Sequence, residues 1–237
     1  MLPWPLLIAG LATAGASTHA LQPAGTFHGG EAVGRDGQAW LALRQLENGT
    51  AELTATRLRV RTVRDEMLDR DDQATGSEVS STVDDALMFV RGEHLKPGSV
   101  VVGKVGAQEP AASGLPDYTI DFAGQPYRIR TTCTPSPEPS IEQQEFHCRL
   151  LLEHGTRTQS LFAMTGYSPP DSSAVLLGDE AGAHLIFAGD LDRDGRLDLI
   201  FDGSHHYNVS LPTLFLSSKA APDELVHQVA QYESVGC

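Results

Sequence analysis

Basic residues are scarce in this chain. Its 17 Lys and Arg stand against 31 Asp and Glu, which gives a formal net charge of −14 at pH 7 and a pI of about 4.9. Nucleic acids and anionic membrane surfaces attract clustered Lys and Arg, so we exclude nucleic acid as the main partner. Long apolar runs are also missing after residue 20, since none approaches the roughly 18 residues that cross a bilayer. We therefore expect no integral membrane segment beyond the first twenty residues.

The common signatures of hydrolases are absent as well. The sequence contains no HExxH, no GxSxG and no paired-glutamate motif. The adjacent His205 and His206 would point to opposite faces of a strand, and a catalytic zinc needs three protein ligands. We favour a protein that is not an enzyme. A secreted hydrolase with a site near Asp202, His205 and His206 is the alternative.

The first twenty residues (1–20) have the features of a secretory signal peptide. They contain no charged side chain and include an apolar stretch over Leu6–Ala14. Small residues at positions 18 and 20 suit the −3 and −1 subsites of signal peptidase, so we expect cleavage after Ala20. Cuts after Ala14 or Ala16 stay open. The protein is accordingly expected to be secreted or periplasmic.

Three cysteines follow, and an exported protein with three cysteines is expected to form one disulfide. Cys133 and Cys148 end and begin strand-like runs on either side of a Pro-rich connector, so a Cys133–Cys148 bridge is our preferred pair. It would close a loop of about 15 residues. Pairing of Cys237 with either of them stays open, as does a free or intermolecular Cys237.

Alternating and apolar runs of strand length, separated by turn residues, dominate the rest of the sequence, and long helical periodicity is missing. Hairpins are predicted at Asn48-Gly49 and at His154-Gly155. The pattern predicts a mainly β protein: an antiparallel sandwich, a barrel or a partial propeller-like sheet. We divide it into an N-terminal β region over 21–171 and a C-terminal β subdomain over 172–237, with one continuous domain over 21–237 as the alternative. Further strands are expected at 86–91, 99–105, 118–122, 125–131, 146–152 and 156–164.

The most informative segment is an aspartate-rich loop near the C-terminus. Aspartates fill loop positions 1, 3, 5 and 9, and glycine fills position 6, in the pattern Asp190-x-Asp192-x-Asp194-Gly195-x-x-Asp198. Oxygens at alternate positions converge as such a loop curls, and position 7 offers its main-chain carbonyl. Ca²⁺ suits this flexible, carboxylate-rich cage better than Mg²⁺, which prefers a strict octahedron. The predicted ligands of Ca²⁺ are Asp190, Asp192, Asp194, Asp198 and the main chain of Arg196.

The residues around the loop distinguish it from an EF-hand. Position 12 is Phe201 rather than glutamate, and both flanks are strand-like, so the loop is a β-hairpin. Over Ala183–Ser218 the chain resembles the FG-GAP or VCBS-type repeat, a calcium-loop element of integrin-like propellers and many bacterial secreted proteins. Only one copy of the loop occurs here. The resemblance implies a structural calcium ion and a module that binds an unknown protein or glycan.

Overall fold

The computed structural model describes residues 18–46, 49–106, 115–137, 144–169, 174–179 and 181–236. Of the predicted signal peptide it describes only residues 18–20, and Cys237 lies outside the described residues. No helix long and apolar enough to span a membrane occurs in the described ranges. Their regular structure consists of β-strands and one short 3₁₀ helix, η1 (Ser217–Lys219). The prediction of a mainly β protein is therefore confirmed.

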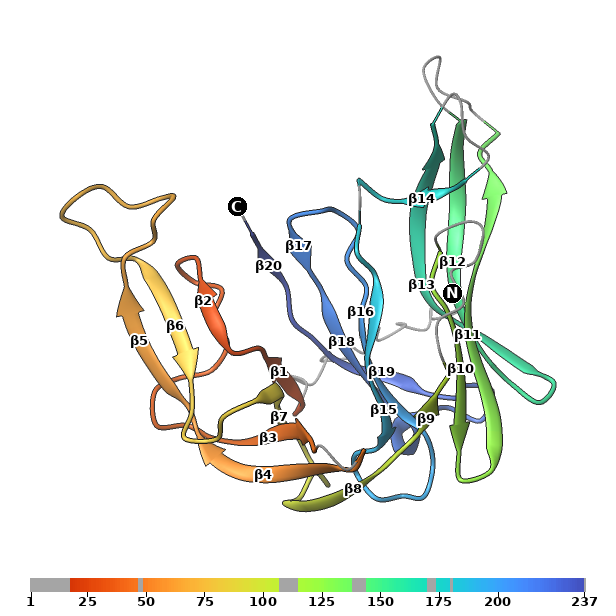
Figure 1. The fold of residues 1–237 in the computed structure, drawn as a ribbon, viewed down its shortest axis with the longest axis horizontal. Helices are drawn as coiled ribbons and strands as arrows, with labels where there is room; N and C mark the ends of the chain where they lie inside the picture. Colours follow the sequence, from red (N-terminus) through yellow and green to blue (C-terminus); the bar gives the residue numbers. More distant parts are fainter. Residues whose placement is uncertain are drawn as a thin grey trace, which may run out of the picture.

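A nine-stranded antiparallel sheet forms the middle of the molecule (Figure 1). The strands at its two ends lie side by side, so the sheet nearly closes into a barrel. In spatial order it consists of β1 (Ala20–Gln22), β7 (Ala86–Arg91), β3 (Ala39–Gln45), β4 (Ala51–Arg57), β8 (Gly98–Val102), β15 (His184–Asp190), β16 (Asp198–Asp202), β18 (Pro212–Leu216) and β19 (His227–Gln231).

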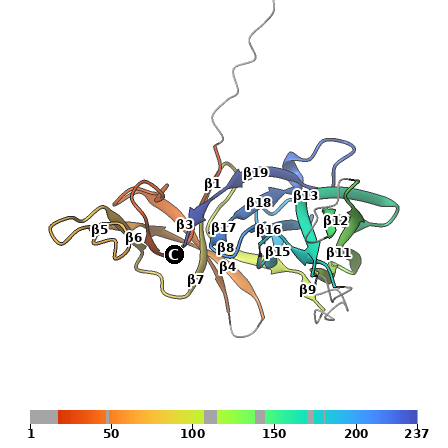
Figure 2. The same cartoon turned by 90° about the horizontal axis from the view of Figure 1, so that it is seen from above.

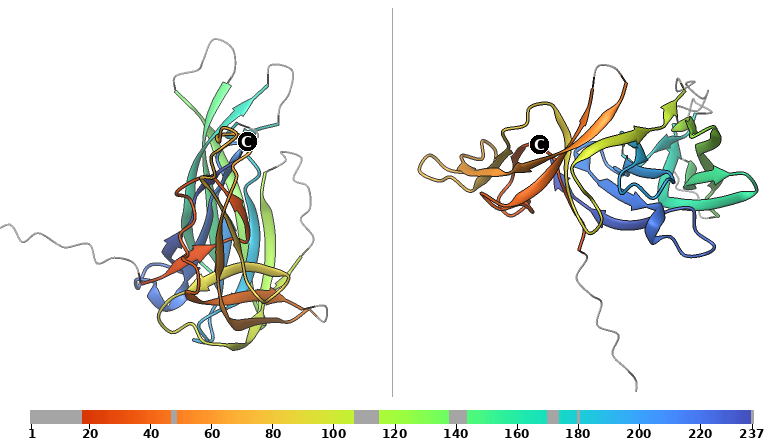
Figure 3. Two further views of the ribbon diagram at one scale, coloured as in Figure 1. Left: turned by 90° about the vertical axis from the view of Figure 1, so that its left-hand side faces the viewer. Right: turned by 90° about the horizontal axis from the view of Figure 1, so that it is seen from below.

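Two further sheets flank the barrel on opposite sides, as Figure 2 shows from above and Figure 3 from below. The six-stranded sheet contains β14 (Leu176–Leu177), β13 (Arg157–Ser168), β12 (Gln144–His154), β11 (Gln125–Pro135), β10 (Asp117–Phe122) and β9 (Lys104–Val105). The three-stranded sheet contains β2 (Gly25–Phe27), β6 (Gly76–Ser80) and β5 (Arg59–Val63). A small pair is formed by β17 (Val209–Ser210) and β20 (Ser234–Val235).

Three hydrophobic clusters hold these sheets together. One fills the inside of the barrel and takes side chains from all nine of its strands. A second lies between the six-stranded sheet and the outer face of β15, β16 and β18. The third lies between β3 and β7 of the barrel and the three-stranded sheet. Because barrel strands come from both sides of residue 172, the two predicted regions share one sheet.

Strand β16 is buried on both of its faces, and this explains its sequence. Leu199 and Phe201 point to the cluster shared with the six-stranded sheet, whereas Ile200 points into the barrel. A strand buried on both faces has no polar side to alternate with, so it is a continuous apolar run. The aspartate loop is therefore attached to one of the most completely buried strands of the molecule.

The predicted local signals are confirmed where the structure describes them. Strands β3 and β4 pair as a hairpin, although Asn48 in its turn lies outside the described residues. Strands β12 and β13 pair around Gly155, whose φ of +58° lies in the left-handed region that favours glycine. The run predicted at 99–105 is broken at Gly103 into β8 and β9. The two halves of that run belong to different sheets.

Strand β1 bears on the signal-peptide prediction. Ala20 is its first residue and pairs with Arg91 of β7, and the preceding His19 is buried. Cleavage after Ala14 or Ala16 would leave this strand whole, whereas cleavage after Ala20 would remove its first residue.

The disulfide joins Cys133 and Cys148, as predicted. The two residues are cross-strand partners in β11 and β12, with Cα atoms 4.0 Å apart. Cys148 is buried in the cluster beneath the six-stranded sheet. Disulfides persist in oxidising compartments, so this bridge is typical of a protein located outside the cytoplasm.

The acidic stretch over 65–72 differs from the solvated loop that its composition suggests, because two of its aspartates are buried. Asp69 accepts hydrogen bonds from the backbone N–H groups of Asp65 and Thr75 and from the Thr75 hydroxyl. Asp65 accepts two backbone N–H bonds and lies 2.5 Å from Nδ1 of His28. These carboxylates hold the loop against the three-stranded sheet.

The His28–Asp65 pair predicts a pH-dependent contribution to stability. Its hydrogen bond is the main cause that raises the pKa of His28 and lowers the pKa of Asp65. The raised His28 pKa stabilises the fold below about pH 6.5 and loses this effect as pH rises through the folded pKa. The lowered Asp65 pKa stabilises above about pH 4 and loses its effect in acid. His28→Ala should therefore lower the melting temperature most near pH 5.5.

Thermal melts at about pH 3, 5.5 and 8.5 check this window. His184→Ala is the control, because His184 is exposed and, within the described residues, its side chain bonds only the carbonyl of Gly182. An equal effect of His28→Ala at all three pH values would contradict the prediction.

Candidate metal centre

The aspartate loop connects β15 to β16 and lies at the joint between barrel strands. Asp190 is the last residue of β15 and pairs with Val101 of β8, while Asp198 is the first residue of β16 and pairs with Gly189. Both ends of the loop are therefore fixed by sheet hydrogen bonds. The loop itself spans only the seven residues between them.

Three of the predicted ligands come together. One carboxylate oxygen from each of Asp190, Asp192 and Asp194 lies within 4.8 Å of the other two. Asp192 Oδ1 is buried and has no hydrogen-bond donor within the described residues. A buried acceptor without a donor carries a desolvation cost, and a cation would satisfy it. Three carboxylates are the kind of ligand set that hard divalent cations prefer.

The backbone of the loop curls around Asp190. Its Oδ1 accepts the N–H of Asp194 at 3.0 Å, and its Oδ2 accepts the N–H of Gly195 at 2.9 Å. Gly195 has a φ of +82°, which glycine adopts without strain. Arg193 also has a positive φ, of 65°. These turns explain why the loop brings alternate aspartates to one side.

Only one arginine of the loop neutralises the aspartates directly. Arg196 forms an ion pair with Asp194, at 2.6 Å between Nη2 and Oδ2. Arg193 instead donates to the carbonyls of Lys96 and Pro97, at 3.1 and 2.8 Å. This contact ties the loop to the turn before β8. Asp190 and Asp192 are left without a cationic partner among the described residues.

Asp198 is fully buried and has a different environment. Its Oδ2 accepts the N–H of Leu191, and its Oδ1 accepts the N–H and the hydroxyl of Ser217. Burial, and next the nearby charge of Asp192, raises the pKa of Asp198 to about 7, against the opposing effect of these hydrogen bonds. A bound cation would favour its ionised form. The ligand roles of Asp198 and of the Arg196 carbonyl stay predictions.

Two serines that sequence reasoning missed also belong to this site. Ser217 donates its hydroxyl to Asp198 and lies 3.2 Å from Asp194 Oδ1, and Ser218 donates its hydroxyl to Asp192. Both belong to η1, which follows β18. Nothing in the local sequence marks them, because they reach the loop through the pairing of β16 with β18.

The residues of the alternative hydrolase site do not form hydrogen bonds with one another. Asp202 accepts from the N–H and hydroxyl of Ser204, from the hydroxyl of Ser210 and from the N–H of Leu211. His206 lies 3.0 Å from Asp179 and 2.5 Å from the Asn208 side chain, and His205 is exposed. Asp202 thus organises a turn, and no specific observation favours the hydrolase.

Comparison of the chain with protein-family models, with curated proteins and with solved structures finds no match. The resemblance to the FG-GAP and VCBS-type repeats stays a prediction that rests on the loop motif.

Proposed function

We propose that this chain is an exported β-protein that binds Ca²⁺ in the loop between β15 and β16, and that the ion is structural. The observation that carries the proposal is the convergence of Asp190, Asp192 and Asp194, together with a buried oxygen of Asp192 that has no hydrogen-bond donor in the described part of the chain. Three carboxylates this close repel one another, and a divalent cation converts the repulsion into attraction.

A structural role is supported by what the loop holds together. It joins two adjacent barrel strands, is tied to the turn before β8 by Arg193, and contacts η1 through Ser217 and Ser218. A cation here would hold together β15, β16 and η1 and, through Arg193, the turn before β8, which lies 97 residues earlier in the sequence. We infer that the rigid barrel serves as a binding module for a protein or a glycan. The disulfide and the features of residues 1–20 support export.

Calcium should raise the melting temperature of the protein. Sites of the extracellular type have Kd values near 10⁻⁴ to 10⁻³ M. At about 1 mM free Ca²⁺ and a Kd of about 0.1 mM, binding stabilises the fold by about 1.4 kcal/mol. For a domain of this size that is roughly 3–6 °C. Thermal melts with Ca²⁺, with Mg²⁺ and with chelator measure the shift, and Ca²⁺ should give the larger one.

Two aspartate variants distinguish Ca²⁺ binding in the loop from Ca²⁺ binding to other acidic side chains of the protein. Asp192→Ala should abolish the calcium-dependent shift while changing the chelator melt little, since it also removes repulsion. Asp72→Ala is the matched control, because Asp72 is an exposed aspartate outside the motif and should retain the shift. The calcium site would be refuted if chelator did not change the melting temperature of the wild type, provided that the chelator-treated protein is then shown to be free of metal.

A further inference from the structure

The chain enters the barrel within the first few residues that the structure describes. Strand β1 pairs with β7 along its whole length, from Ala20 opposite Arg91 to Gln22 opposite Phe89. On its other side it lies beside β19, so β1 is the strand at which the barrel nearly closes (Figure 2). Leu21 is 1% exposed and packs in the cluster inside the barrel. The barrel therefore includes the chain from Ala20 onward.

His19, just before β1, also has a fixed place in the fold. Its ring is buried, and Nε2 lies 3.3 Å from the carbonyl oxygen of Glu93. Gly92 leaves room for the ring, because a Cβ atom at this position would overlap Cδ2 of His19. Burial is the main cause that lowers the pKa of His19, so the fold holds the ring in its neutral form near pH 7. Thr18, by contrast, is exposed, so among the described residues burial begins at His19.

These contacts distinguish the bonds at which signal peptidase can cut. A cut after Ala20 would remove His19 and Ala20, and it would place the new ammonium group on Leu21, in the wall of the barrel. An ammonium group that is partly buried without a partner costs free energy. A cut after Ala14 or Ala16 keeps the buried histidine and the whole of β1.

The apolar stretch of the leader decides between the two remaining bonds. It runs over Leu6–Ala14, and the small residues that signal peptidase recognises at −3 and −1 follow such a stretch. A cut after Ala14 would place the −3 residue, Ala12, inside the stretch. A cut after Ala16 places Ala14 at −3, at the end of the stretch, and Ala16 at −1.

We infer that signal peptidase cleaves the bond between Ala16 and Ser17, so that the mature chain begins at Ser17. Water adds across this amide, which leaves a carboxylate on Ala16 of the leader and an ammonium group on Ser17. The bond itself lies outside the described residues, and the cut retains His19 and β1 for the barrel. The inference rests on the export proposed above but not on the metal.

The full chain, expressed with its leader in a bacterial host and recovered from the periplasmic extract, tests the inference. Labelling of free amines, followed by digestion and mass spectrometry, identifies the N-terminal residue, and we expect Ser17. A mature chain that begins at Gly15 or at Leu21 would overturn the inference and leave the proposed export intact. A chain that keeps Met1 and stays in the cytoplasm would overturn both.

Melting curves of two mature chains test the structural reason for the inference. A chain that begins at Leu21 should melt roughly 4 °C or more below one that begins at Ser17. The shorter chain lacks the buried ring of His19 and the first residue pair between β1 and β7. Equal melting temperatures would contradict the inference. A shorter chain that does not fold, beside a longer chain that does, would support it.

Two variants of the chain that begins at Ser17 separate the buried residue from its exposed neighbour. His19→Ala should lower the melting temperature, because it empties the space over Gly92. Thr18→Ala, at an exposed residue, should change it by less than about 2 °C. Equal effects of the two variants would contradict the role of His19. Melts of the same chain with Ca²⁺ and with chelator test the metal site independently, so the two proposals fail separately.

Discussion

Asp198→Ala should lower the free energy of unfolding by about 3 kcal/mol, even in chelator. The substitution leaves the backbone N–H groups of Leu191 and Ser217 without an acceptor. Each buried group that loses its partner costs about 1–3 kcal/mol. Part of this loss is offset, because the buried carboxylate itself carries the desolvation cost that raises its pKa to about 7. The net loss corresponds to roughly 6–12 °C in melting temperature.

The comparison with Asp192→Ala makes this prediction specific. Asp192 accepts only the hydroxyl of Ser218 among the described residues, and its other oxygen has no donor. Its removal should therefore change the chelator melt by less than about 1 kcal/mol. Chemical denaturation of both variants in chelator measures the difference. Equal stability of Asp198→Ala and the wild type would show that the hydrogen bonds of Asp198 to the loop and to η1 do not stabilise the fold.

Local signals explain why much of the fold was predictable from the sequence. The β3–β4 and β12–β13 hairpins each depend on alternation and a turn glycine within about twenty residues. The convergence of Asp190, Asp192 and Asp194 depends on the same kind of short-range information, since backbone turns within the loop bring them together. A pattern that is local in sequence can be interpreted without the rest of the chain.

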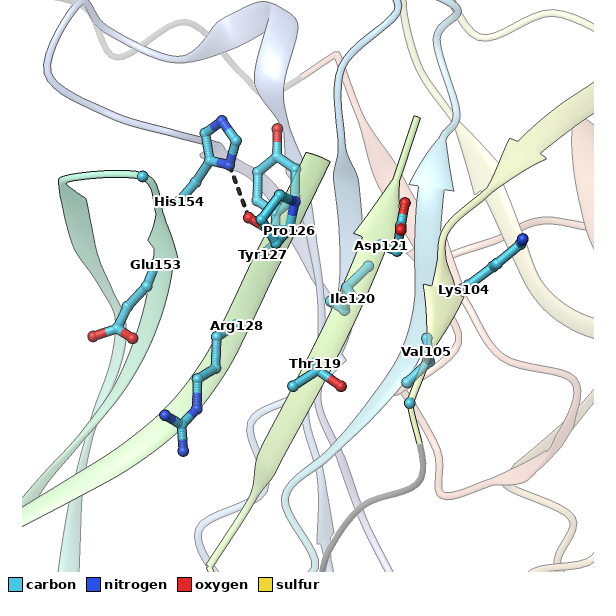
Figure 4. A pocket seen from close by; sticks show the side chains of 12 residues that line it. Lys104, Val105, Thr119, Ile120, Asp121, Pro126, Tyr127, Arg128, Glu153 and His154 are labelled. Carbon is cyan, nitrogen blue, oxygen red and sulfur yellow. Dashed lines mark hydrogen bonds between the residues drawn. The ribbon is translucent and has the colours of Figure 1, made fainter. Parts of the chain in front are cut away.

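Pairings between distant segments were beyond the sequence for a physical reason. Ser217 reaches Asp198 because β16 and β18 are neighbours, and His28 reaches Asp65 across 37 residues. Strand order in an antiparallel sheet is decided by packing of whole faces, which no short motif encodes. The stacked pair of Tyr127 and His154 likewise depends on the register of β11 and β12 (Figure 4).

Removal of the disulfide should lower the free energy of unfolding by about as much as Asp198→Ala does. In the chain-entropy model, a bridge across 15 residues stabilises the fold by about 3 kcal/mol, mainly by restricting the unfolded chain. The Cys133→Ala/Cys148→Ala double variant should therefore melt roughly 6–12 °C lower than the wild type. Alanine is the better replacement than serine, because Cys148 is buried and a hydroxyl there would add an unsatisfied polar group.

The bridge joins directly paired residues of β11 and β12, so its loss should act on the six-stranded sheet first. Hydrogen exchange should consequently quicken in β11 and β12, while β16, buried on both faces in the barrel, changes less. Cys237→Ser is the control, and its melting curve should match that of the wild type.

Peptide mapping without reductant should recover Cys133 and Cys148 as one cross-linked pair. The protein for this experiment is recovered from the compartment to which it is exported. Free thiols at both positions would contradict the bridge and the argument for export that depends on it.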